Sequence, residues 1–84
     1  MAKYERQINL RPAELIRTLG GSLRKAGRTM IDSSSYEVGG ASAHLQVWDG
    51  MSLLVIGMGG SSTVTAISPD GADISLVEMT LDKA

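Results

Sequence analysis

The stretch AHLQVWDGMSLLVIG, residues 43–57, carries the strongest structural signal in the chain. In residues 43–48 apolar side chains alternate with polar or aromatic ones, which is the two-residue period of a β-strand. Asp49 and Gly50 follow as a dipeptide typical of a tight hairpin turn, and residues 51–58 are apolar on both sides. We therefore predict an antiparallel hairpin whose second strand is central in a sheet.

The hairpin turn also predicts which side chains share a face of the sheet. A two-residue turn pairs Trp48 with Met51, and turns of even length later in the chain carry that face onward. The predicted face comprises His44, Gln46, Trp48, Met51, Leu53, Val55, Val64, Ala66, Val77, Met79 and Leu81. The opposite face receives Ala43, Leu45, Val47, Leu54, Ile56, Met58, Ile67, Ile74 and Leu76. Both faces are thus expected to be largely apolar.

The sequence before the hairpin predicts one strand and one helix. Residues 4–10 alternate in the pattern of a half-buried strand. Pro12 suits the first turn of a helix, and Gly27 is expected to end it. Gly20 and Gly21 lie inside this helix and indicate close packing on a sheet. Between its ends an apolar stripe falls at helical spacing, formed by Leu15, Ile16, Leu19, Leu23 and Ala26.

The segments after this helix are all predicted to be extended. RTMIDSSSYEV, residues 28–38, indicates a weak strand that is bulged or lies at a sheet edge. STVTAIS, residues 62–68, and DISLVEMTL, residues 73–81, predict two further strands joined by a turn at 69–71. The fold class is therefore α+β, with a strand, one amphipathic helix, and an antiparallel meander of four to five strands packed on the helix. We expect a single domain over residues 1–84.

The glycine-rich stretch GMGGSS, residues 57–62, resembles a phosphate-binding loop in composition. Ser62 stands where a dinucleotide fingerprint has its third glycine, and no lysine follows the glycines as it does in a P-loop. The residues downstream have the types of a strand, so no helix N-terminus is expected to face an anion. We predict that this stretch is a hairpin turn.

No residue pattern indicates catalysis. His44 is the only histidine, the chain has no cysteine, and a lone histidine on an alternating strand is more typical of cross-strand pairing than of a base or metal ligand. The serines belong to no nucleophile elbow. We therefore predict a non-enzymatic protein with no catalytic residue, cofactor or metal site.

Charge is distributed unevenly along the chain. Residues 1–31 hold seven Lys or Arg against two Glu, and residues 32–84 hold one Lys against seven Asp or Glu, so the two parts carry +5 and −6. We expect a basic part and an acidic part that attract one another or are solvated, and a nucleic-acid surface is not indicated. No export signal or membrane-spanning stretch is predicted, so we expect a cytoplasmic location.

Several stretches resemble a family of small bacterial proteins of unknown function. The resemblance lies in the opening MAKYER, a helix, a serine-rich strand ending YEVGG, an alternating strand, a glycine-bearing hairpin and the strand TAIS. It implies an α+β sheet-and-helix fold and no activity. Members continue into a further C-terminal helix, which we expect to be absent after MTLDKA in this chain.

Size and apolar excess together predict self-association. A chain of 84 residues without cysteine has few other means of strengthening a small core. We predict a protein that acts through protein–protein contact, with itself as a homodimer or larger homo-oligomer, or with another protein. The predicted interface comprises Trp48, Met51, Leu53, Val55, Val77, Met79 and Leu81. The alternative is a module that sequesters an anionic or nucleotide-like ligand through Arg17, Arg24 and Arg28, as a phage-encoded or regulatory protein would.

Overall fold

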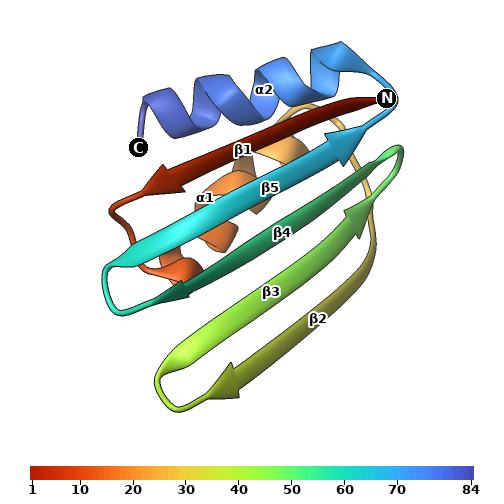
Figure 1. Cartoon of the computed structure of the whole chain (residues 1–84). Helices are drawn as coiled ribbons and strands as arrows, with labels where there is room; N and C mark the ends of the chain where they lie inside the picture. Colours follow the sequence, from red (N-terminus) through yellow and green to blue (C-terminus); the bar gives the residue numbers. More distant parts are fainter.

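The computed structural model describes residues 1–84, which form one antiparallel sheet and two helices (Figure 1). In chain order the elements are β1 (Ala2–Ile8), α1 (Pro12–Lys25), β2 (Met30–Val38), β3 (Ala41–Trp48), β4 (Met51–Met58), β5 (Ser61–Ser68) and α2 (Gly71–Asp82). The five strands are ordered β1-β5-β4-β3-β2, so the first strand lies beside the last one. The α+β class and the strand, helix and meander order predicted from the sequence are confirmed.

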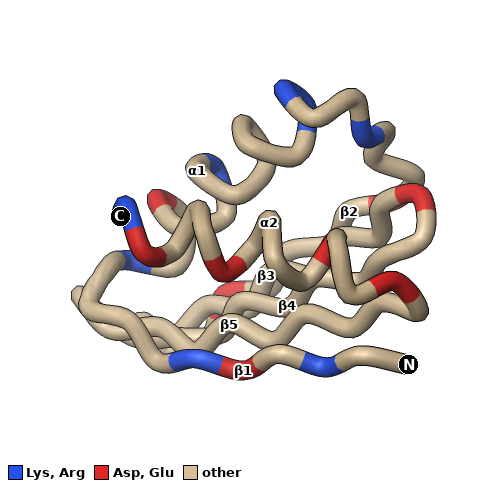
Figure 2. The backbone as a smooth tube through the Cα atoms, turned by 90° about the horizontal axis from the view of Figure 1, so that it is seen from above, with Lys and Arg blue, Asp and Glu red and all other residues tan.

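Both helices cover the same face of the sheet. Figure 2 shows α1 and α2 together in a layer above the strands, with no element on the other side. α1 lies over β3 and β4, and α2 lies over β1 and β5. Neither helix is long and apolar enough to cross a membrane.

The predicted hairpin register is confirmed. Trp48 is paired with Met51, and the pairing continues along β3 and β4 without a break. The glycine stretch forms the β4–β5 hairpin turn, as predicted. Its positive φ lies at Gly59, with a value of 60°, and not at Gly60. This is the sign that the first position of a two-residue II′ turn requires, so Gly59 is the conformationally special residue of this turn.

α1 begins and ends where the sequence predicts. Pro12 occupies its first turn, and Gly27 follows its end with a φ of 83°. Gly20 is buried, and a Cβ built on it would lie 3.7 Å from Cζ2 of Trp48. The expected close packing on the sheet is therefore seen at Gly20, whereas Gly21 has no such neighbour.

The predicted last strand at residues 73–81 was wrong, because the segment forms α2. Asp70 caps this helix, and its carboxylate accepts a 2.9 Å hydrogen bond from the backbone N–H of Ala72. Asp73, Val77 and Leu81 are buried at intervals of four residues, which is a helical stripe facing the sheet. α2 is also a C-terminal helix, so the expectation that the chain lacks one was wrong.

The core lies between the sheet and the two helices. Its side chains are almost fully enclosed, and they come from α1, from the helix-facing side of β3, β4 and β5, and from α2. They are Leu15, Leu19, Leu23, Trp48, Met51, Leu53, Val55, Val64, Ala66, Val77 and Leu81.

β2 is the outer strand on the β3 side and has an irregular register between Met30 and Asp32. The prediction of a weak strand at an edge or with a bulge is confirmed in both respects. Such a bulge interrupts the pairing edge of a strand locally.

Candidate protein-binding surface

The side of the sheet turned away from both helices is uncovered, and we call it the open face (Figures 1 and 2). The paired registers and the alternation of burial assign its residues. They are Lys3, Glu5 and Gln7 of β1; Ser61, Thr63, Thr65 and Ile67 of β5; Ser52, Leu54, Ile56 and Met58 of β4; Ala41, Ala43, Leu45 and Val47 of β3; and Asp32, Ser34, Tyr36 and Val38 of β2.

Large apolar side chains on the open face are exposed to solvent. Leu45, Ile56 and Met58 retain 42%, 48% and 61% of their accessible surface, and Tyr36 and Val38 retain still more. These residues lie on adjacent strands, so they form one connected patch and not isolated exposures. A contiguous apolar patch of this kind marks an interaction surface more often than scattered apolar residues do.

Charges on the open face are confined to its two edge strands. The three central strands present no Asp, Glu, Lys or Arg on this side. Lys3 and Glu5 lie on β1 at one edge, and Asp32 lies on β2 at the other. An uncharged centre with a charged rim is the arrangement that protein–protein interfaces share.

The predicted interface through Trp48 is corrected by the structure. Trp48, Met51, Leu53, Val55, Val77 and Leu81 are buried within one copy of the chain, and Met79 alone of that set is exposed. The physical reason is α2: once residues 71–82 form a helix, two helices are available to cover the Trp48 face. The apolar surface left without cover is therefore the opposite face of the sheet.

The three arginines predicted as anion contacts do not form one site. Arg17 is exposed on α1, and the guanidinium of Arg24 lies over the indole of Trp48, 5.5 Å from the ring centroid. Arg28 forms an ion pair with Asp73 of α2. Two of the three cations are thus engaged with the protein itself.

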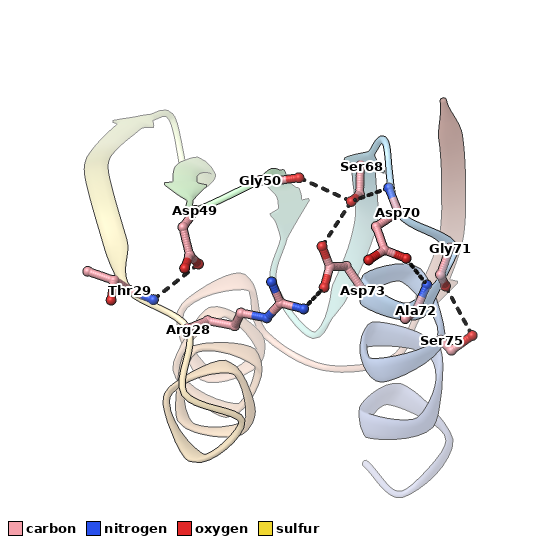
Figure 3. Close-up of polar contacts among 10 residues, drawn as sticks. All are labelled: Arg28, Thr29, Asp49, Gly50, Ser68, Asp70, Gly71, Ala72, Asp73 and Ser75. Carbon is pink, nitrogen blue, oxygen red and sulfur yellow. Dashed lines mark hydrogen bonds and ion pairs between the residues drawn. The ribbon is translucent and has the colours of Figure 1, made fainter.

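Asp73 is the centre of a polar network that sequence reasoning missed (Figure 3). Its side chain is 5% exposed and is paired with Arg28, and the hydroxyl of Ser68 lies 3.0 Å from its Oδ2. The same hydroxyl lies 3.1 Å from the carbonyl oxygen of Gly50 and accepts a hydrogen bond from the N–H of Asp70. The network joins the start of α2 to the β3–β4 turn and to the loop after α1. Every member of the network bonds to another part of the fold, so the network holds these segments together.

The opposite charges of the two parts of the chain meet directly. Arg28 pairs with Asp73, and Arg6 pairs with Asp82 at 2.5 Å. The hydrogen bond that the Arg6 guanidinium donates to the carboxylate of Asp82 raises the pKa of Arg6 above its ordinary value, because it favours the charged form. Both ion pairs join the basic N-terminal part to the acidic C-terminal part, as the charge distribution led us to expect.

His44 pairs across strands, as predicted for a lone histidine. Its Nδ1 lies 2.9 Å from the hydroxyl oxygen of Ser35 on β2, and its Nε2 is enclosed without a hydrogen-bond partner. A serine nucleophile would need this ring to be oriented by a third group, and no carboxylate contacts it. The side chains do not gather three carboxylate or imidazole groups as a metal site would require.

Two shallow hollows lie on the helix side of the molecule. One, of about 400 Å³, runs between α1 and α2 and includes Met79 in its wall. The other, of about 390 Å³, lies at the start of α1, where Arg11 meets the turn glycines 59 and 60. Glu37 lines this second hollow as well, and its negative charge opposes an anionic ligand.

Comparison with known proteins finds a similar fold but no similar sequence. No model of a known protein family matches the sequence, and no curated protein matches it. Among solved structures, the crystal structure of the uncharacterized conserved protein DUF302 from Bacillus stearothermophilus has a TM-score of 0.63 to this chain. The match covers 99% of this chain and 98% of that chain at 13% sequence identity. At this identity the likeness shows a shared fold, so the chain is similar in architecture to an uncharacterized bacterial protein.

Proposed function

We propose that this protein is a small non-enzymatic binding protein that associates with a second copy of itself through the open face. The observation that supports this most strongly is the solvent-exposed apolar patch on β2, β3 and β4, together with the absence of charged side chains from the open side of the three central strands. Burial of such a patch between two sheets is the usual way in which β-sandwiches enclose their cores.

The open face is large enough for a specific dimer. Five strands about 4.8 Å apart and eight residues rising about 3.3 Å each give a face of roughly 600 Å² in projection. Two stacked copies would then bury on the order of 1,200 Å², which is at the lower end of the range for stable, specific interfaces. An area of this size supports a reversible dimer more than a permanent one.

Two methionines provide a matched test of the proposal. Met58 on the open face is 61% exposed, and Met79 on α2 is 56% exposed on the helix side of the molecule. Met58→Lys should convert a dimer to a monomer, because it places a charge within the apolar patch that the dimer would bury. Met79→Lys changes the same residue type at similar exposure and should leave the dimer intact.

The measurement is sedimentation velocity of the parent and both variants at several micromolar concentrations, with circular dichroism to show that each is folded. A parent chain that remains monomeric at hundreds of micromolar would contradict self-association. Dissociation by Met79→Lys but not by Met58→Lys would place the contact on the helices instead.

The alternative, a module that sequesters an anionic ligand, has weaker support. The hollow at the start of α1 brings one arginine to the glycine turn, but Glu37 lines it and Arg28 is committed to Asp73. A ligand that binds the folded state must raise its melting temperature. A rise in melting temperature with millimolar phosphate or a nucleotide, lost in Arg11→Gln, would favour this alternative.

A further inference from the structure

The charges on the open face determine how a second copy can lie on it, and this inference rests on the self-association proposed above. Lys3, Ile67, Ser52, Val47 and Asp32 are consecutive partners across the sheet and form one row. Lys3 is at the β1 end of this row and Asp32 is at its β2 end. The row therefore has a cation at one edge of the face and an anion at the other.

Two symmetric ways of stacking the face on a copy of itself are available. A two-fold axis parallel to the strands and above β4 keeps every row over the same row and exchanges the two edges. Each Lys3 then lies above Asp32 of the second copy, and this occurs twice because the contact is reciprocal. The residues that β4 contributes to the open face lie opposite the same residues of the second copy.

The second arrangement has its two-fold axis across the strands, so that each strand lies over itself and the rows are reversed. Asp32 would then face Val38 of the second copy, because these residues occupy the first and last rows on β2. Lys3 would be on the far edge and could not reach it. A carboxylate would be partly desolvated against methyl groups without a counter-ion, which opposes this arrangement.

We propose that the chain forms a face-to-face homodimer whose two-fold axis runs parallel to β4, closed at its edges by two reciprocal ion pairs between Lys3 and Asp32. Stacked sheets of this kind cross at about −30°, which displaces the corners of the face by a few ångströms. The long, flexible lysine side chain accommodates that displacement. Lys3 and Asp32 thus set the orientation of the dimer, and the apolar patch provides the contact area.

Single cysteines distinguish the two arrangements, because the chain has no cysteine of its own. In the proposed dimer Ser52 on β4 faces its own copy, whereas Ser34 on β2 is displaced from its copy by four strand spacings, roughly 19 Å. In the other arrangement Ser34 is displaced from its copy by one row, roughly 7 Å, and Ser52 by three rows, roughly 20 Å. Ser→Cys is nearly isosteric at both positions, so both variants should fold.

The experiment is cross-linking of Ser52→Cys and Ser34→Cys by a short bismaleimide, read on a denaturing gel. We expect a cross-linked dimer from Ser52→Cys and none from Ser34→Cys. A dimer, shown by sedimentation, in which Ser52→Cys does not cross-link overturns the proposed axis and leaves self-association standing. A parent chain that is monomeric throughout overturns both proposals.

Charge reversal tests the ion pairs themselves. Lys3→Asp and Asp32→Lys should each weaken the dimer roughly tenfold, because two attractive pairs become repulsive, and the double variant should regain most of the loss. Circular dichroism melts of each variant separate dissociation from unfolding. If Ser52→Cys cross-links but the double variant does not regain dimer affinity, the proposed ion pairs between Lys3 and Asp32 are wrong.

Discussion

Replacement of Gly57 by alanine tests whether the glycine stretch serves packing. Gly57 lies on β4 opposite Ser62 of β5, beneath the first turn of α1. A Cβ built on Gly57 would overlap the carbonyl oxygen of Ser61, and it would lie 2.8 Å from Cα of Ser62 and 2.9 Å from Cγ of Pro12. Two of these neighbours are backbone atoms and the third is a proline ring, so none can rotate away.

The expected loss of stability follows from this geometry. Overpacking of a well-packed site costs about 1–3 kcal/mol, and the higher end applies here because the β4–β5 pairing or the start of α1 must move. For a domain of this size each 1 kcal/mol lowers the melting temperature by about 4–8 °C. We expect Gly57→Ala to lose about 3 kcal/mol and to melt roughly 15 °C below the parent.

Two neighbouring glycines provide the controls, and thermal denaturation followed by circular dichroism provides the assay. Gly59→Ala should lose about 1 kcal/mol, because its φ of 60° is unfavourable for a side chain. Gly60→Ala should stay within about 0.5 kcal/mol of the parent, because its φ is ordinary and no atom lies within 4 Å. If Gly57→Ala has the same melting temperature as Gly60→Ala, the packing argument is refuted.

Two further predictions concern the helices and the polar network. Gly21→Ala should raise stability by about 1 kcal/mol in thermal melts, because the site is in a helix interior and no atom lies within 4 Å of the added Cβ. Gly27→Ala should lower stability by a similar amount, because its φ is 83°. A change of stability in the same direction for both variants would contradict this reasoning. Asp73→Ala should lower the free energy of unfolding in urea by about 2 kcal/mol, because Ser68 loses a buried acceptor and Arg28, still one-third exposed, loses its partner. An unchanged urea midpoint for Asp73→Ala would show that water replaces the carboxylate without cost.

The strands and their register were determined by the sequence, because the signals for them are local. Alternation of side chains in residues 43–48 and the turn at Asp49 and Gly50 specify a hairpin wherever one face is buried. The helix over residues 12–25 is bounded by Pro12 and Gly27, whose backbone preferences do not depend on the rest of the fold.

The state of residues 73–81 was decided by tertiary structure. Their apolar residues fit a strand at a spacing of two, and Val77 and Leu81 also fit a helix at a spacing of four. Asp73 obscured the helical stripe, because an acidic residue is not expected on a buried position. Only the fold supplies Ser68 and Arg28 as its partners. The Asp70 cap was a further local signal that favoured the helix.

The formation of α2 also decided which face of the sheet is open. The sequence determines that both faces are apolar, because the alternation in β3, β4 and β5 places apolar residues on each side. Which face is covered depends on how many helices form and on the side to which they return. This is a property of long-range packing, for which no short segment carries a signal. The tertiary structure therefore placed Trp48 in the core and left Leu45, Ile56 and Met58 exposed on the surface that we propose a second copy covers.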